Sequence, residues 1–287
     1  MKALATVRSA EWLLIGYLTY VALISTQFPL QPTVARLPLL LPFLVIALIA
    51  VLAYGESVTS HKFFSMARDW VPLPLTLAAY REMDWFTPLG WDHHFELKWI
   101  EWDRSLLYGA GLQRAIESLG AILPGYFEFC YLLVYAVGPF LVTMFYVEHR
   151  REAVNRALLV YLTGTLVAYG LFPYFPSEPP RTFFAESDLP GVLTPIRQFN
   201  LWIVNGVGIH SSVFPSAHVS SAFSAAWAFL RYLPHRKRIG WGMLIYAASV
   251  AIAAVYGRYH YAVDVVAGLG VSLLAAGVAL LATDRHR

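Results

Sequence analysis

The chain is poor in charged residues and almost free of cysteine. Of its 287 residues 14% are charged and one, Cys130, is a cysteine, whereas 58% are hydrophobic. Soluble domains usually contain about 25% charged residues. This deficit and a mean hydropathy of +0.55 therefore place the chain among integral membrane proteins. A single cysteine cannot form an intramolecular disulfide bond, and it excludes a metal site built from thiolates.

The sequence also lacks internal repeats and low-complexity tracts. A net charge of +3 would suit a nucleic-acid ligand if the basic residues formed one surface. They lie instead mostly in short turns between apolar runs, as the topology of membrane proteins predicts. No nucleic-acid partner is therefore expected.

Apolar runs long enough to cross a bilayer fill most of the chain. About 20 helical residues span the hydrocarbon core. The clear spans are 12–28, 37–54, 122–147, 154–172, 216–233, 240–256 and 261–283. The first is predicted to be a retained span, because no small-x-small cleavage site follows it. Segment 70–85 is ambiguous, since its apolar centre is short and contains Pro72 and Pro74.

Short basic turns predict the orientation of these spans. Lys and Arg are enriched on the cytoplasmic side of membrane proteins, and here they occur before the first span, near 150–156, in the turn 236–238 and after the last span. An even number of crossings must separate the N-terminus from the turn at Arg150, so 70–85 counts as a short or tilted crossing. The sequence thus predicts eight crossings with both termini in the cytoplasm of a cell or inner membrane.

The expected fold is all-α, a polytopic transmembrane helical bundle. Residues 1–60 are predicted to form an N-terminal transmembrane hairpin, and residues 61–287 a six-helix domain that carries the candidate catalytic residues. Tryptophans interleaved with charged residues over 91–119 predict an amphipathic helix at the membrane interface. The outer loop 173–213 contains several prolines, so we expect an ordered cover that is not helical.

Ser216 and His218 stand at the start of a predicted helix on the outer side. Ser216 follows Pro215, and serine is a preferred N-cap residue. The free N–H groups of a first helical turn, together with the helix dipole, attract anions. Ser216, Ala217 and His218 are therefore a candidate phosphate site with a proton donor beside it.

His260 and Asp264 form a second candidate group. Residues four apart share one face of a helix, so Asp264 can accept the imidazole N–H of His260 and leave the other ring nitrogen free as a base or nucleophile. The two apolar runs between the histidines are each about 27 Å long. They form a hairpin, which returns His260 to the membrane face that carries His218.

Two other interpretations of these residues stay open. Asp264 and His260 could be a structural pair that locks two helices, because buried ionisable groups in membranes pair with each other. His218, His260 and Asp264 could also bind zinc. No metal is expected, because HExxH-type spacing is absent and two arginines, Arg181 and Arg258, are expected nearby.

Together the two blocks resemble the type 2 phosphatidic acid phosphatase superfamily, the metal-independent membrane phosphatases that are also related to vanadium haloperoxidases. The first block is Pro215-Ser216-Ala217-His218, and the second, HYAVDVVAG, runs from His260 to Gly268. The resemblance covers the chain from about Trp70 onward. It implies an enzyme that uses neither a metal nor a cofactor.

The resemblance also implies a role for each residue. His260 would attack phosphorus to give a phosphohistidine, Asp264 would orient His260, and His218 would protonate the leaving alkoxide. Ser216, Ala217 and the N–H groups that follow would hold the phosphoryl oxygens.

Arg181 and Arg258 are the candidate phosphate clamps, because the guanidinium fork matches phosphate. The sequence departs from the family pattern around them. The loop has no lysine ahead of Pro179-Pro180-Arg181, and Ala254 replaces the arginine usually found six residues before the histidine of the second block. Ala217 likewise replaces a glycine. The Pro-Pro-Arg element and the extra N-terminal spans resemble the subgroup that contains inositol phosphorylceramide synthases.

Hydrolysis of a lipid phosphate at the extracytoplasmic face is the activity expected from these features. One alternative is transfer of a phospho-headgroup onto an alcohol, as in inositol phosphorylceramide synthases, and another is a transporter or scaffold without enzymatic activity. The expected partners are the bilayer and a phospholipid, isoprenoid phosphate or sphingolipid phosphate. The sequence does not indicate an oligomeric state.

Four further polar residues are weaker candidates for the site. His93 and His94 are assigned to a solvated loop. Glu128 and Glu178 could contact an acceptor hydroxyl, although packing or interfacial solvation explains them more simply.

Overall fold

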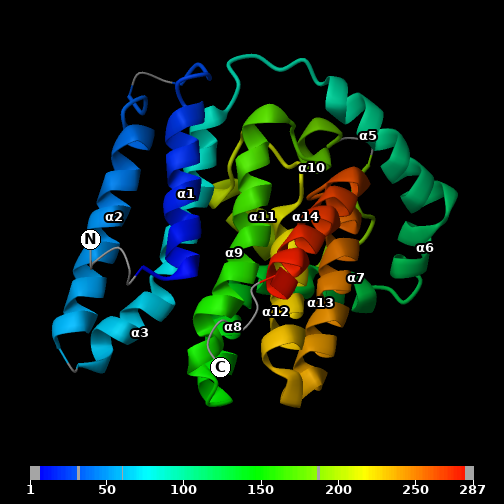
Figure 1. Cartoon of the computed structure of the whole chain (residues 1–287). Helices are drawn as coiled ribbons and strands as arrows, with labels where there is room; N and C mark the ends of the chain where they lie inside the picture. The colour runs from blue at the N-terminus through cyan, green and yellow to red at the C-terminus, as the bar shows by residue number, and fades with distance from the viewer. Residues whose placement is uncertain (1–6, 31–32, 60, 186–187, 282–287) are drawn as a thin grey trace.

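Long helices run side by side through most of the molecule (Figure 1). The structure is a computed structural model and describes residues 7–30, 33–59, 61–185 and 188–281, which form helices and turns and contain no strand. The α-helices are α1 (Ser9–Ile24), α2 (Leu37–Val58), α3 (Lys62–Trp70), α4 (Pro72–Glu82), α5 (His94–Arg104), α6 (Leu112–Glu117), α7 (Ile122–Leu132), α8 (Val137–Val147), α9 (Val154–Leu171), α10 (Pro180–Phe183), α11 (Pro195–Val207), α12 (Ala217–Tyr232), α13 (Lys237–Tyr256) and α14 (Ala262–Leu281). Short turns of other helix types are η2 (Met83–Phe86), η3 (Ser105–Gly109), η4 (Leu133–Ala136), η5 (Arg151–Ala153), η6 (Phe172–Tyr174) and η7 (Pro234–Arg236).

The predicted all-α membrane bundle is confirmed. Among the described residues, five helical stretches are long and apolar enough to cross a membrane: Leu37–Val58, Ile122–Val147, Arg151–Tyr174, Pro234–Tyr256 and Ala262–Leu281. Helix α1 is apolar but has only 16 residues, and α4 and α12 are also shorter than a full span. The prediction of eight crossings counts these three shorter helices as spans.

Ion pairs gather several basic turns at one end of the bundle, which we call the basic end. Arg8 before α1 and Arg151 before α9 both pair with Asp69 at the end of α3, at 2.6 and 2.7 Å. In the turn before α13, Arg236 pairs with Glu148, which directly follows α8, at 2.8 Å. These contacts bring together turns that the sequence analysis assigned to the cytoplasmic side.

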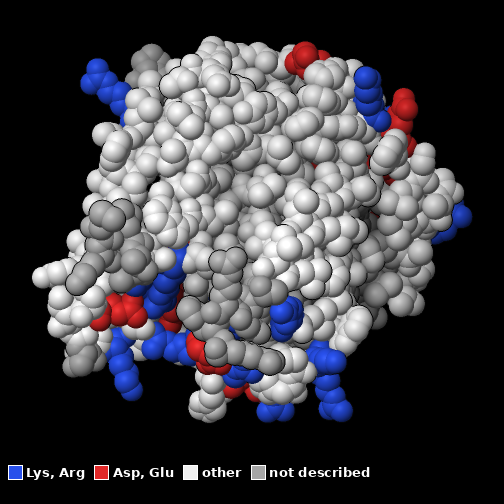
Figure 2. Space-filling model, viewed as in Figure 1, with Lys and Arg blue, Asp and Glu red and all other residues white. Residues whose placement is uncertain are grey.

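Charged side chains are concentrated at the margins of the molecule. Figure 2 shows Lys, Arg, Asp and Glu along its lower edge and at its upper right and a basic side chain at its upper left, with a broad band of other residues between the upper and lower groups. Such a band suits the apolar interior of a bilayer. Lys2, Arg285 and Arg287, which the sequence analysis used for orientation, lie outside the described residues.

The ambiguous segment 70–85 runs from the basic end to the opposite end. It begins beside Asp69, and at its far end Asp84 accepts a hydrogen bond from the backbone N–H of His210 in the outer loop, at 2.8 Å. Phe86 then contacts Phe28, which follows α1, with ring centroids 5.6 Å apart. Helix α4 and η2 together are about 22 Å long at 1.5 Å per residue, so the segment is short, in line with the short or tilted crossing predicted for it.

The prediction that the outer loop 173–213 lacks helix is wrong. The short α10 and the longer α11 both lie in it. Pro180 and Pro195 occupy the first turns of these helices, where proline has no N–H bond to lose and its fixed φ suits a helix. The Thr194 side chain also accepts a hydrogen bond from the N–H of Arg197, at 3.1 Å, and caps α11. The prolines therefore start the helices of this loop.

The amphipathic helix predicted over 91–119 is present as α5, η3 and α6. Its inner face is partly acidic, because the Glu96 and Asp103 side chains are buried against the rest of the protein. Trp102 points outward and is 57% exposed. Helix α5 packs against α14, so this segment lies beside the second histidine block.

Small residues allow α12 to pack closely against α9 and α14. The Ser220 hydroxyl of α12 donates a hydrogen bond to the Gly164 carbonyl of α9, at 2.8 Å. On α14, a methyl carbon added to Gly268 would lie 2.5 Å from the carbonyl oxygen of Ser216. Only glycine therefore allows the start of α12 to approach α14 this closely.

Replacing Gly268 by alanine is expected to destabilise the protein by about 1–3 kcal/mol, because the added methyl group pushes α12 away from α14. Gly270→Ala is the matched control, since no heavy atom lies within 4 Å of a methyl group added there. The measurement is the thermal unfolding midpoint of each variant in detergent. Equal midpoints for the two variants would contradict the packing described for Gly268.

Candidate functional site

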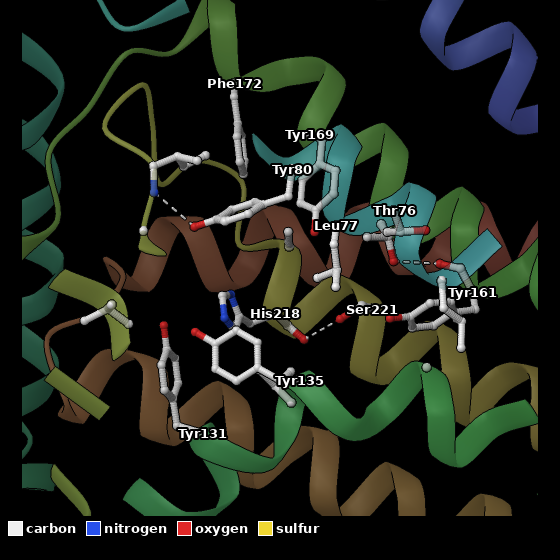
Figure 3. A pocket seen from close by; sticks show the side chains of 18 of the residues that line it. Thr76, Leu77, Tyr80, Tyr131, Tyr135, Tyr161, Tyr169, Phe172, His218 and Ser221 are labelled. Atoms are coloured by element: carbon white, nitrogen blue, oxygen red, sulfur yellow. Dashed lines mark hydrogen bonds between the residues drawn. The ribbon is translucent and has the colours of Figure 1, made fainter. Parts of the chain in front are cut away.

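An apolar cavity of about 550 Å³ lies inside the bundle and reaches two histidines. Its walls come from α4, η4, α8, α9 and the start of α12. Figure 3 shows His218 with Tyr131 and Tyr135 on one side and Tyr80 and Tyr169 across the open space. Arg181, Tyr259 and His260 also line the cavity. It therefore combines a long apolar wall with a small polar end.

The cavity wall includes side chains that are exposed on the outside of the bundle. Leu77 of α4 and Tyr135 of η4 are 62% and 45% exposed, and both line the cavity. The neighbouring lining residues Pro74 and Pro139 are also exposed. Because these residues belong to α4, η4 and α8, the cavity opens sideways between these elements.

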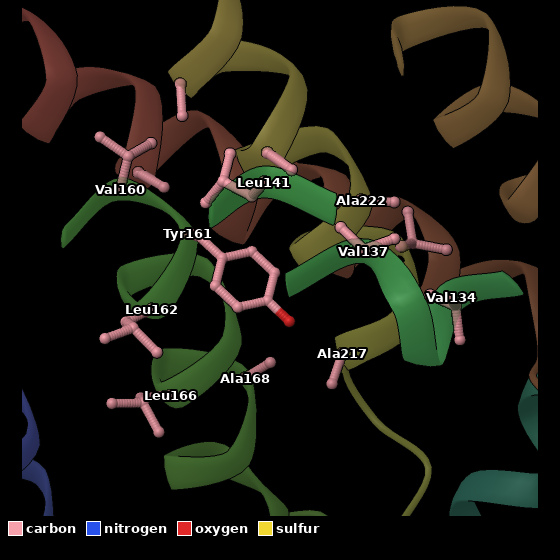
Figure 4. Close-up of a cluster of buried hydrophobic side chains, with 14 of the residues drawn as sticks. Val134, Val137, Leu141, Val160, Tyr161, Leu162, Leu166, Ala168, Ala217 and Ala222 are labelled. Atoms are coloured by element: carbon pink, nitrogen blue, oxygen red, sulfur yellow. The ribbon is translucent and has the colours of Figure 1, made fainter. Parts of the chain in front are cut away.

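Another part of the cavity wall belongs to the packed core. Tyr161 of α9 lines the cavity, and Figure 4 shows its ring among aliphatic side chains that include Val137 and Leu141 of α8. Leu141 is fully buried. Close packing of this kind holds α8 and α9 together.

His218 lies in the first turn of α12, at the polar end of the cavity. The predicted N-cap is confirmed, because the Ser216 hydroxyl accepts a hydrogen bond from the N–H of Val219, at 3.4 Å. The His218 ring stacks on Tyr131, with centroids 4.9 Å apart and planes inclined by 10°. Ala217 lines the cavity beside it, whereas Ser216 is fully buried at the contact with α14.

His260 lies 5.6 Å from His218, measured between ring centroids. Contrary to the assumption that His260 and Asp264 share a helix, α14 begins only at Ala262, and His260 belongs to the preceding turn. Its Nδ1 is 2.9 Å from the carbonyl oxygen of Val213. A carbonyl only accepts hydrogen bonds, so Nδ1 carries the proton and Nε2 keeps its lone pair.

Asp264 supports His260 in two ways. Its Oδ2 lies 3.4 Å from Nδ1 of His260, close enough to stabilise positive charge on the ring. The same oxygen accepts a hydrogen bond from the N–H of Tyr261, at 2.8 Å, which is the acidic half of a capping box at the start of α14. The carboxylate therefore fixes the turn that contains the histidine.

Burial lowers the pKa of His260 well below its ordinary value, and the nearby His218 and Arg181 lower it further, while the hydrogen bond to Val213 opposes the shift. The ring is therefore neutral at pH 7. A neutral imidazole with a free Nε2 has the form required of a nucleophile or base.

Arg181 brings a guanidinium group to the polar end of the cavity. Its backbone N–H donates to the carbonyl of Arg258, at 3.0 Å, and its guanidinium carbon lies 5.7 Å from the centre of the Tyr259 ring. No carboxylate of the described residues pairs with Arg181, and its buried Nε has no hydrogen-bond partner there. The group is therefore placed to bind an anion in the cavity.

Arg258, the other candidate clamp, lies outside the cavity wall. Its backbone has φ 62°, and its Nη1 pairs with Asp103 of α5 at 2.5 Å, with both side chains buried. Asp103 also accepts a hydrogen bond from the N–H of Ala262, at 2.7 Å. Asp103 was not among the predicted site residues, although its spacing of seven from Glu96 places both acids on one helix face.

Most of the other polar candidates lie away from the cavity wall. His94 is exposed and contacts Asp92, and His93 stacks on Phe183 of α10 with centroids 4.2 Å apart. The backbone N–H of Glu178 donates to Glu96, at 2.8 Å. Within the part of the chain that the structure describes, no three His, Cys, Asp or Glu side chains are grouped to hold a metal ion.

Comparison with known proteins identifies one family. A family model described as the PAP2 superfamily matches residues 100–278. The matched segment extends from α5 into α14 and contains Arg181, both histidines and Asp264. No curated protein and no solved structure matches the chain significantly.

Asp103→Asn is expected to destabilise the protein by about 3–5 kcal/mol, because it leaves the buried Arg258 without a counter-charge. The control is Glu152→Gln, which removes an exposed ion pair with Arg150 and should cost less than about 1 kcal/mol. Unfolding in detergent, followed by tryptophan fluorescence, measures both. A similar loss of stability in the two variants would show that the buried ion pair stabilises the protein no more than the exposed one.

Proposed function

The chain belongs to the PAP2 superfamily, and from this we propose that it cleaves lipid phosphates through a phosphohistidine formed on His260. Membership makes it a lipid-phosphate enzyme of the phosphatase or phosphotransferase type. One observation supports the proposed phosphohistidine mechanism. The imidazole rings of His218 and His260 lie 5.6 Å apart, at the polar end of an apolar cavity and beside the unpaired guanidinium of Arg181.

The first step of the proposed reaction transfers the phosphoryl group to the protein. Nε2 of His260 attacks phosphorus, the bond from phosphorus to the lipid oxygen breaks, and His218 donates its proton to that oxygen. Asp264 stabilises the positive charge that develops on the His260 ring. Arg181 and the N–H groups at the start of α12 hold the phosphoryl oxygens.

The second step releases the phosphate. A water molecule attacks phosphorus and gives its proton to His218, while the bond from phosphorus to Nε2 breaks. Free phosphate leaves, and both histidines return to their starting forms. Two displacements of this kind replace one difficult step with two easier ones.

The shape of the cavity supports a lipid substrate. Its opening between α4 and α8 carries exposed apolar side chains such as Leu77. An acyl or isoprenoid chain can therefore lie along the apolar wall while its phosphate reaches the histidines. Since basic turns mark the cytoplasmic side and gather at the basic end of the bundle, we place the histidines at the extracytoplasmic face.

His260→Ala is expected to abolish turnover of phosphatidate in mixed micelles, and His218→Ala to lower it by about 10²–10⁴-fold through loss of the general acid. The matched control is His210→Ala, because His210 is an exposed histidine of the outer loop. The parent protein should keep its rate in the presence of a chelator. Turnover that survives in His260→Ala would refute the nucleophile assignment.

Transfer of the phosphoryl group to an alcohol is the second candidate function. Arg181 is the one Lys or Arg side chain among the described residues of the cavity wall, and its single charge matches a phosphodiester better than a phosphomonoester dianion. Mass analysis of the products separates the two functions. Free phosphate indicates hydrolysis, and a new phosphodiester indicates transfer.

The lowered pKa of His260 predicts the pH dependence of the reaction. The nucleophile is the neutral ring, so protonation of His260 should not lower kcat/KM as the pH falls through about 6.5, the ordinary histidine value, and should lower it only at more acidic pH. The measurement is the pH profile of kcat/KM, corrected for ionisation of the substrate. A decline centred at 6.5 or above would show that His260 is protonated like an exposed histidine.

A further inference from the structure

Glu128 of α7 is the centre of a buried hydrogen-bond network that the proposed reaction does not use. Its Oε1 accepts from Nη1 of Arg197, at 2.7 Å. Its Oε2 accepts from the Tyr259 hydroxyl at 2.6 Å and from Nδ2 of Asn200 at 2.7 Å. The side chain is 2% exposed. Because both oxygens are occupied, Glu128 is not free to serve as a base for an acceptor hydroxyl.

The network joins three segments that are distant in sequence. Arg197 and Asn200 lie on α11 of the outer loop, and Glu128 lies on α7. Nη1 of Arg197 also donates to the carbonyl of Gly257, at 3.0 Å. The turn that leads into His260 is therefore held against both α7 and α11.

Tyr259 connects this network to the polar end of the cavity. Its ring stacks on Tyr131, with centroids 3.9 Å apart and planes inclined by 12°, and Tyr131 in turn stacks on His218. The Arg181 guanidinium lies 5.7 Å from the same Tyr259 ring. A shift of Tyr259 would therefore displace the proposed proton donor and the proposed phosphate clamp together.

We propose that Glu128 is a positioning residue, which holds the Tyr259 hydroxyl and so aligns His218 and Arg181 with the phosphate. The effect on turnover rests on the proposed function, whereas the effect on anion binding does not. The charge of Glu128 also neutralises Arg197, whose guanidinium carbon lies 5.7 Å from the Tyr259 ring. Arg181 is thereby left as the cation that faces the phosphate.

The test compares Tyr259→Phe, Glu128→Ala, their double variant and Glu128→Gln. Tyr259→Phe keeps the stacked ring and removes only the hydroxyl, so it should fold. We expect kcat for phosphatidate to fall at least tenfold in Tyr259→Phe and in Glu128→Ala. The double variant should be little worse than the poorer single variant, because both remove the same hydrogen bond. Glu128→Gln can still accept from Tyr259 but leaves Arg197 without its counter-charge, so it should recover part of the rate that Glu128→Ala loses.

Ser249→Ala is the matched control, because it removes the hydrogen bond between Tyr126 of α7 and Ser249 of α13, at 2.8 Å, which lies outside the network. It should keep kcat within about twofold of the parent. The thermal unfolding midpoints of all variants distinguish a variant that has lost stability from one that folds normally but has lost the alignment of His218 and Arg181. The proposal is overturned if Tyr259→Phe keeps the parent kcat, or if the two single effects multiply in the double variant.

Binding of orthovanadate, a phosphate analogue, gives a measurement that does not require turnover. Isothermal titration in detergent should show at least tenfold weaker binding in Tyr259→Phe and unchanged binding in Ser249→Ala. If the parent turns over no lipid phosphate, the proposed function fails, and the vanadate result alone decides the positioning role. Equal vanadate affinity in Tyr259→Phe and the parent would overturn that role.

Discussion

The site depends on one contact between the beginnings of two helices. The N–H of Ser216, just before α12, donates a hydrogen bond to the carbonyl of Asp264 in α14, at 2.9 Å, and Gly268 leaves room for this approach. Helices α12 and α13 form the hairpin that returns the chain to this point. The contact places His218 and His260 side by side, and both ends of it belong to the sequence blocks that contain the histidines.

Charge pairing then decides which cation faces the cavity. A buried charge in apolar surroundings is strongly destabilising without a partner, and two arginines near the histidines have one. Arg258 pairs with Asp103, and Arg197 pairs with Glu128. Arg181 has no such partner among the described residues, and it lines the cavity. Two of the three arginines are thus neutralised by buried carboxylates, and in the described part of the chain Arg181 is not.

Local patterns predicted the parts of this structure that depend on local physics. The apolar runs predicted a helical membrane bundle, and Pro215 with Ser216 predicted the start of α12. The length of the hairpin predicted that His218 and His260 would meet, because helix rise per residue is constant.

The wrong or missing predictions concern residues whose structure depends on their position within a helix or on partners that are distant in sequence. The prolines of the outer loop predicted a segment without helix, yet Pro195 stands at the first turn of α11, where proline favours a helix. The direction of Arg258 depends on a backbone with positive φ and on Asp103, which is 155 residues away. Likewise, the role of Glu128 depends on α11 folding back onto α7. Contacts of this kind follow from tertiary structure and leave no periodic signal in one sequence.

The sideways opening between α4 and α8 determines which measure of ligand concentration is relevant to this protein. A ligand that arrives through the side of the bundle comes from the plane of the membrane, where its supply is set by its mole fraction among the surrounding lipids. Adding inert detergent or lipid then slows the encounter even when the molarity in the whole solution is constant. For such a ligand, diffusion in two dimensions and crowding by neighbouring membrane proteins would govern how often the cavity is filled.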